Sequence, residues 1–112
     1  MGCIFCDIVA GKAPASLVYE DASFMAFMDL FPMRPGHTLV IPKMHAGYVS
    51  DLTPELRAGL FELGNRILQA QVRAGLPVQG HNLIINDGPA ANQHVPHVHL
   101  HVIPRVQGDL HK

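Results

Sequence analysis

Apolar residues in the N-terminal part of the chain fall into short extended runs separated by turn residues. Residues 16–20 and 24–29 are two such runs, and the Asp-Ala-Ser sequence at 21–23 between them is typical of a hairpin turn. A third run, 37–42 (H-T-L-V-I-P), follows a segment broken by prolines and a glycine at 32–36. The pattern therefore predicts three successive antiparallel strands.

The middle of the chain changes to helical spacing. Thr53 is a favourable N-cap residue, and Pro54 follows it at the position where a helix tolerates proline best. Gly75 and Pro77 end the pattern. These signals predict one long helix over 54–74. Its core-facing stripe consists of Leu56, Leu60, Leu63, Ile67 and Ala70.

Two further strands are predicted after the helix, at 81–86 and at 97–103, with a loop of small residues over 87–93 between them. Pro96 and Pro104 are expected to bound the last strand. The order β-β-β-α-β-β predicts an α+β fold, in which a five-stranded antiparallel meander sheet packs one face on one long helix. A chain of 112 residues has room for one domain, 1–112, and its small size favours a homodimer.

Composition excludes some classes of function. With 8 basic and 9 acidic residues and no dense run of Lys or Arg, the chain lacks the charge pattern of a nucleic-acid binder. Its apolar runs are short, and no basic start followed by an apolar stretch opens it. We therefore expect no membrane span and no signal peptide, and a cytoplasmic protein. The unusual feature is the number of histidines, 8 in all.

Histidine and apolar residues alternate over 97–103 (H-V-H-L-H-V-I). On a strand, the three imidazoles project from one face, while the valines and the leucine enter the other. Adjacent buried imidazoles need specific partners, which favours a functional role. Two roles are open at this point: a catalytic metal site, or a histidine nucleophile flanked by substrate-orienting histidines. Neutral imidazole can attack phosphorus without a metal, and three consecutive histidines are spaced too widely for one compact site.

The alternation resembles the signature of the histidine-triad (HIT) family. The resemblance extends from C-I-F-C through P-G-H-T-L-V-I-P-K-M-H to N-D-G-P-A-A-N-Q-H-V-P-H-V-H-L-H-V-I-P-R. It implies that His99 is the nucleophile of a nucleotidyl-histidine intermediate, that His101 stabilises the phosphate, and that His97 supports the site. Asn86 and Gln93, with the loop backbone between them, match the phosphate-side contacts of the family.

Two other positions are interpreted through the same resemblance. His94 stands where the family usually carries Ser or Thr, and it is either a solvated loop residue or a group that assists the leaving group. Asp29 alone would be a strand-end carboxylate, but the matching aspartate of the family binds the ribose hydroxyls. The positions that match the apolar slot for the base are Ile4, Phe5, Ile8, Phe27 and Leu30.

A C-x-x-C pair, Cys3 and Cys6, opens the chain. By itself this pair is compatible with redox chemistry, metal binding or no role at all, and a thioredoxin-like site would need a preceding strand. Many bacterial-type HIT proteins bind structural zinc with this pair, the histidine of P-K-x-H and the first triad histidine. The resemblance therefore implies a Cys₂His₂ site for one zinc ion per subunit, formed by Cys3, Cys6, His45 and His97. Such a site contributes stability rather than chemistry.

The resemblance as a whole implies a homodimeric hydrolase of the zinc-containing Hint-like branch, which releases AMP or GMP from purine nucleoside 5′-phosphoramidates. Two alternatives stay open. The D-G-P and H-V-x-P-R phrases are shared with the fragile-histidine-triad branch, whose members hydrolyse dinucleoside polyphosphates. A module that binds the nucleotide for regulation could use the same pocket, although an intact His99 favours an enzyme.

Overall fold

The computed structural model describes residues 2–109; Met1 and residues 110–112 of the predicted domain lie outside the described part. Helices and strands follow one another as α1 (Ile4–Val9), β1 (Leu17–Glu20), β2 (Phe24–Met28), β3 (Thr38–Pro42), η1 (Val49–Asp51), α2 (Pro54–Arg73), β4 (Gly80–Ile84), η2 (Pro89–Ala91) and β5 (Leu100–Arg105). The short helix α1 was not predicted, because six residues are too few for helical periodicity to appear.

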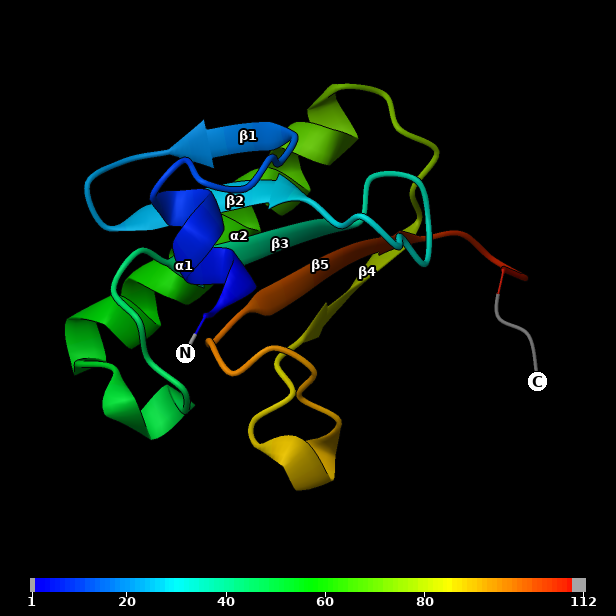
Figure 1. Ribbon diagram of the computed structural model, residues 1–112. Coiled ribbons are helices and arrows are strands. Elements are labelled where there is room, and N and C mark those ends of the chain that lie inside the picture. Colours follow the sequence, from blue (N-terminus) through cyan, green and yellow to red (C-terminus); the bar gives the residue numbers. More distant parts are fainter. Residues whose placement is uncertain (1, 110–112) are drawn as a thin grey trace.

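The strands form one antiparallel sheet in the order β1-β2-β3-β5-β4 (Figure 1). This confirms the predicted α+β class, with five antiparallel strands and one long helix. The order differs from a simple meander because β5 lies between β3 and β4. β4 alternates between exposed and half-buried positions, whereas most of β5 is buried, so the more apolar strand occupies the interior of the sheet.

Helix α2 covers one face of the sheet, and its bounds agree closely with the prediction. Thr53 caps its N-terminus, where the hydroxyl accepts a hydrogen bond from the Leu56 amide. A Cβ atom at Gly64 would lie 2.5 Å from Leu100 Cδ2, so this glycine allows the helix to approach β5 closely. None of the described helices has the length and apolar character needed to cross a membrane.

Helix α1 lies over the opposite face of the sheet, so that the central strands are buried on both sides (Figure 1). Phe5 and Ile8 of α1 pack against Phe27 of β2 and Leu39 of β3. The alternation of the strands sends neighbouring residues to the two layers, which is why β2 and β3 are apolar almost throughout. The second apolar layer places α1 directly over the histidine-bearing end of the sheet.

The strand predicted at 97–103 begins later than expected, because the backbone before Leu100 pairs with a loop instead of β3. The Val98 amide donates to the Ala46 carbonyl at 2.8 Å. The Pro42 carbonyl accepts from the imidazole of His97, also at 2.8 Å. His97 and His99 therefore precede β5, although their side chains and that of Val98 still point to opposite faces.

The predicted boundary at Pro104 was wrong, since β5 continues through it to Arg105. The Arg105 carbonyl accepts from the Gln79 amide on the β4 side, so the nitrogen of Pro104 faces the β3 side. The pairing with β3 has already ended there, at the Thr38 and Val102 pair. A missing N–H group therefore costs no ladder hydrogen bond at this position.

Candidate functional site

The structure brings four histidines together beneath α1, three of which the sequence predicted. His99 and His101 have their ring centroids 5.0 Å apart. The fourth is His37, which is 2% exposed and immediately precedes β3. Sequence reasoning missed it because both faces of β3 are apolar, so no amphipathic pattern indicated which way His37 points. The only signal was its place in the P-G-H phrase.

Hydrogen bonds to carbonyl groups determine the tautomers of His97 and His99. A carbonyl oxygen can only accept, so His97 carries its proton on Nε2, which donates to the Pro42 carbonyl at 2.8 Å. His99 carries its proton on Nδ1, which donates to the His97 carbonyl at 2.7 Å. The unprotonated atoms are therefore Nδ1 of His97 and Nε2 of His99.

His37 determines the tautomer of His101, which is the opposite of the tautomer of His99. The Met33 amide donates to Nδ1 of His37 at 3.1 Å, so His37 carries its proton on Nε2. That Nε2 lies 2.9 Å from Nδ1 of His101 and donates to it. His101 consequently carries its own proton on Nε2. Three histidines spaced two residues apart thus present two different lone pairs and one N–H donor.

Burial keeps these imidazoles neutral at neutral pH. Desolvation lowers the pKa of His37, of His97 and of His99, and it lowers the pKa of His101 to about 4. The carboxylate of Asp29 opposes this effect on His37, His99 and His101, but burial is the larger cause for each. A neutral His99 has the lone pair that a nucleophile needs.

Asp29 lies at the edge of the histidine cluster, at the end of β2. One carboxylate oxygen accepts from the Phe31 amide at 2.9 Å, and the other lies 3.4 Å from Nε2 of His37. The next residue, Leu30, is 74% exposed and faces solvent rather than the apolar layer. The loop after Asp29 therefore presents an open apolar side chain beside a carboxylate.

The other predicted base-slot residues lie mostly inside the layer between α1 and the sheet. Phe5, Ile8 and Phe27 are buried, whereas Ile4 is exposed. The Phe5 ring stands edge-on to His99, with centroids 5.0 Å apart, and edge-on to Phe27 at 5.5 Å. Helix α1 and β2 thus form an apolar wall, made of Phe5, Ile8 and Phe27, next to the His99 ring.

The loop between Asn86 and His94 is clamped to the segment that follows β3. The Gln93 side chain accepts from the Gly88 amide at 2.7 Å and donates to the Gly47 carbonyl at 2.9 Å. Its amide is therefore engaged within the protein. Asn86 is half-buried, and His94 is exposed. A positive charge on His94 would lower the pKa of both His99 and His101, which places it within electrostatic range of the two triad residues.

A second cluster joins the N-terminal cysteines to two histidines. The ligand atoms of Cys3, Cys6, His45 and His97 all lie within 4.8 Å of one another. Cys6 Sγ is 3.2 Å from Nδ1 of His45, and Cys3 Sγ is 3.5 Å from Nδ1 of His97. The bond from His97 to the Pro42 carbonyl leaves this Nδ1 free to bind a metal. Two thiols and two imidazole nitrogens fit the tetrahedral donor set that zinc prefers.

Asp29, His37 and His101 also lie within metal-ligating distance of one another. Their hydrogen bonds fit a metal poorly, because Nε2 of His37 carries a proton and donates it to His101. A metal there would require His37 to move its proton to Nδ1, where the Met33 amide already donates. This group is therefore a hydrogen-bonded relay, and within the described residues the three triad histidines do not form one metal cluster.

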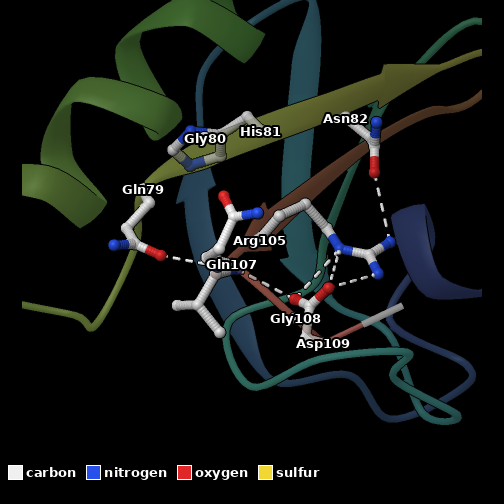
Figure 2. Close-up of a pocket in the computed structure, with 9 residues that line it drawn as sticks. Gln79, Gly80, His81, Asn82, Arg105, Gln107, Gly108 and Asp109 are labelled. Carbon is white, nitrogen blue, oxygen red and sulfur yellow. Dashed lines mark hydrogen bonds and ion pairs between the residues drawn. The ribbon is translucent and has the colours of Figure 1, made fainter. Parts of the chain in front are cut away.

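A cavity of about 310 Å³ lies at the other end of the β4–β5 hairpin and contains none of the triad residues (Figure 2). Its charged groups pair with each other, because Arg105 binds Asp109 at 2.7 Å and also donates to Asn82 at 3.1 Å. The Arg105 guanidinium lowers the pKa of Asp109 to about 2. The histidine cluster, rather than this cavity, carries the reactive groups.

Comparisons with known proteins agree with this geometry. The family model described as HIT domain matches residues 10–108. An uncharacterized HIT-like protein of Mycobacterium tuberculosis is 47% identical over 109 residues, which are 97% of this chain and 75% of that protein. The adenosine 5′-monophosphoramidase of Schizosaccharomyces pombe is 39% identical over 105 residues, 94% of this chain and 75% of that enzyme. A Zn-bound histidine triad family protein from Mycobacterium smegmatis matches with a TM-score of 0.92 at 50% identity, covering 97% of this chain and 78% of the other.

Proposed function

The chain belongs to the HIT domain family, and we propose that it is a nucleotide hydrolase that releases AMP or GMP from purine nucleoside 5′-phosphoramidates. The observation that carries the proposal is the pair of free atoms on His99 and His101. The His99 ring, with an unprotonated Nε2, lies beside the His101 ring, with an Nε2–H donor, and their centroids are 5.0 Å apart. The similarity to an adenosine 5′-monophosphoramidase supports the class of substrate.

The proposed reaction has two steps. Nε2 of His99 forms a bond to the α-phosphorus as the bond to the amine nitrogen breaks, and the amine leaves with a proton taken up from solvent water. Water then attacks the nucleotidyl-histidine, which frees the imidazole and yields the nucleoside monophosphate. The carbonyl of His97 holds Nδ1–H of His99 and stabilises the positive charge of the modified ring. His101 donates Nε2–H to a phosphoryl oxygen, an interaction that strengthens as charge develops.

The remaining site residues would bind the substrate. We assign the ribose hydroxyls to Asp29, whose carboxylate borders the histidine cluster. The apolar wall would take the base, and the exposed Leu30 is free to cover it. Asn86 and the loop backbone would face the phosphate, with Gln93 holding that loop in shape. His94 is the candidate partner of the leaving amine. The apolar wall that would take the base consists of Phe5, Ile8 and Phe27.

We further propose that one HIT domain spans 1–112 and holds one structural zinc ion on the Cys₂His₂ cluster. Zinc there would anchor α1 to the catalytic segment. The proposed form is a cytoplasmic homodimer with no nucleic-acid or membrane partner. Among residues 2–109, no strand pairs with the outer edge of β4, and Ile84 and Ile85 beside it are 37% and 36% exposed, which supports self-association.

A product analysis tests the proposal. The protein is incubated separately with adenosine and guanosine 5′-phosphoramidates and with diadenosine polyphosphates, and the released nucleotides are separated by chromatography. Samples quenched in alkaline denaturant preserve the phosphorus–nitrogen bond, so that mass spectrometry detects a nucleotidyl adduct on His99. We expect monophosphate release with a burst of adduct. Nucleotide binding without adduct or turnover would instead indicate a regulatory module, and a preference for polyphosphates would indicate the other enzyme branch.

A further inference from the structure

We propose that Gln71 of α2 is a positioning residue for the catalytic relay: it holds the Gly36 carbonyl and thereby places His37 against His101. His81 of β4 fixes the orientation of the Gln71 amide. The proposal rests on the proposed function, because it assigns a support to the same histidines. It adds two residues that lie outside the motifs of the sequence and outside the site itself.

Gln71 is 8% exposed, and both ends of its amide are paired. Nε2 donates to the Gly36 carbonyl at 2.7 Å and lies 3.4 Å from the Thr38 hydroxyl. Because a carbonyl cannot donate, Nε2 must face Gly36, and Oε1 must face His81. Nε2 of His81 lies 2.8 Å from that oxygen and donates to it. The amide can therefore adopt only one orientation in this network.

Gly36 is the point where this support meets the loop between Asp29 and His37, called the catalytic loop below. Its φ of +88° is favourable only for glycine. A Cβ atom there would lie 3.1 Å from Pro104 Cγ and 3.3 Å from Leu76 Cδ1, so the backbone is tightly enclosed. Its carbonyl accepts two hydrogen bonds, from Gln71 and from the Thr38 hydroxyl at 2.8 Å. Since His37 is the next residue, the direction of this peptide determines where the relay begins.

The rest of the loop is tied to the same histidine. The Asp29 amide donates to the His37 carbonyl at 3.0 Å, and the His37 amide donates to the Arg34 carbonyl at 3.1 Å. A displacement at Gly36 would therefore move the His37 ring and change its 2.9 Å contact with Nδ1 of His101. Without that contact, His101 is free to place its proton on Nδ1 and lose its donor toward the phosphate.

Gln71 is also an unusual choice for the buried face of α2. The other buried residues of this helix are Leu60, Leu63, Gly64 and Ile67, none of which has a polar side chain. Burying an amide is unfavourable unless its groups are paired, so an apolar residue would satisfy the core more simply. The complete pairing at both ends indicates that the amide is needed for its directional contacts.

The outer end of the network lies at the surface cavity. Figure 2 shows the His81 ring turned toward α2, whereas Arg105 and Asp109, which also line the cavity, are paired on the other side of the strands. Arg34, in the loop between Asp29 and His37, also lies 3.2 Å from Asp109. The catalytic loop is therefore held on one side by Gln71 and His81, and on another by the ion pair at the cavity.

The test compares Gln71→Met with Gln69→Met, a matched change at an exposed position of the same helix. His81→Phe is the second, milder variant, since it removes only the bond that orients Gln71. We measure kcat and KM for an adenosine phosphoramidate, the unfolding temperature, and the ¹⁵N shifts of the imidazole rings. For Gln71→Met we expect kcat to fall by at least about tenfold with KM within about threefold, because relay geometry rather than binding is lost.

The NMR measurement separates positioning from stability. In the wild type, Nδ1 of His101 should be unprotonated, and in Gln71→Met the ring should become a mixture of tautomers, while Gln69→Met keeps the wild-type spectrum. A lower unfolding temperature with unchanged kcat and ring shifts, measured well below unfolding, overturns the proposal. If Gln71→Met does not fold, the same readouts on His81→Phe decide. If the wild type turns over no nucleotide, the proposed function fails, and the ring shifts alone decide whether Gln71 sets the tautomer.

Discussion

Zinc at the Cys₂His₂ cluster should stabilise the fold by about 4 kcal/mol without taking part in catalysis. Two routes give this size. A ligand at about a thousand times its dissociation constant adds about 4 kcal/mol to the unfolding free energy. Releasing α1 would expose Phe5 and Ile8, and burial of two such side chains contributes roughly 3 to 6 kcal/mol. For a domain of this size, 4 kcal/mol corresponds to a Tm shift of roughly 15 °C.

The perturbation is the double variant Cys3→Ser/Cys6→Ser, compared with wild-type protein treated with a chelator. Thermal unfolding followed by circular dichroism gives Tm, and elemental analysis gives the metal content, which we expect to be about one zinc per subunit in the wild type. Both samples should melt earlier yet keep measurable turnover below the transition. The control is the chelator added to the double variant, which should have no effect.

Two results would refute this reasoning. Wild-type protein washed to remove loosely held metal could contain no zinc, in which case the four ligands do not form a resident site. Alternatively, removal of zinc could eliminate all turnover while circular dichroism shows a folded protein. The second result would restore the metal-hydrolase interpretation of the triad.

Further predictions concern the histidines. His99→Ala should abolish turnover and leave nucleotide affinity nearly unchanged, as measured by calorimetry; residual activity within about tenfold of wild type contradicts the nucleophile assignment. His101→Ala should lower kcat more than it weakens binding, which steady-state kinetics will resolve. For an adenosine phosphoramidate, kcat/KM should exceed that for diadenosine polyphosphates by at least about tenfold, or roughly 1.4 kcal/mol. His94→Ser should reduce this difference if His94 assists amine departure. An equal or reversed preference, measured with and without divalent metal, would assign the enzyme to the dinucleoside polyphosphate hydrolases. Burial lowers the pKa of His37 and of His81 below 6.5 in the folded protein, so on acidification the unfolded chain binds protons at a higher pH than the folded protein does. The free energy of unfolding should therefore decrease as pH falls through about 6.5. Urea melts from pH 8 to 5 that show no such decrease would count against neutral buried rings.

The features of the fold that repeat along the chain could be predicted from the sequence. The stripe of α2 from Leu56 to Ile67 and the alternation around β5 follow from side-chain geometry, and both recur in the packed layers. The last predicted member of the stripe, Ala70, was wrong: it is exposed, and Gln71 takes the buried position instead. The position of β5 inside the sheet could not be predicted, because it depends on which of two strands buries more surface. Helix α1 is too short for a periodic signal, and its capping contact is a sulfur atom of Cys3. His37 could not be assigned to a face, because β3 is a central strand whose two sides are both buried.

The triad shows where sequence reasoning about a site ends. Alternation identifies three imidazoles on one face, but it treats them as equivalent. Their partners make them different: a carbonyl on Nε2 leaves Nδ1 of His97 for a metal, and a carbonyl on Nδ1 leaves Nε2 of His99 for attack. His37 donates a hydrogen bond to Nδ1 of His101, so His101 carries its own proton on Nε2 and can donate it. These partners are Pro42, the His97 backbone and His37, and two of the three come from β3 or the loop before it. The chemistry of His97 and of His101 therefore depends on how β3 and β5 pair, which only the folded chain determines.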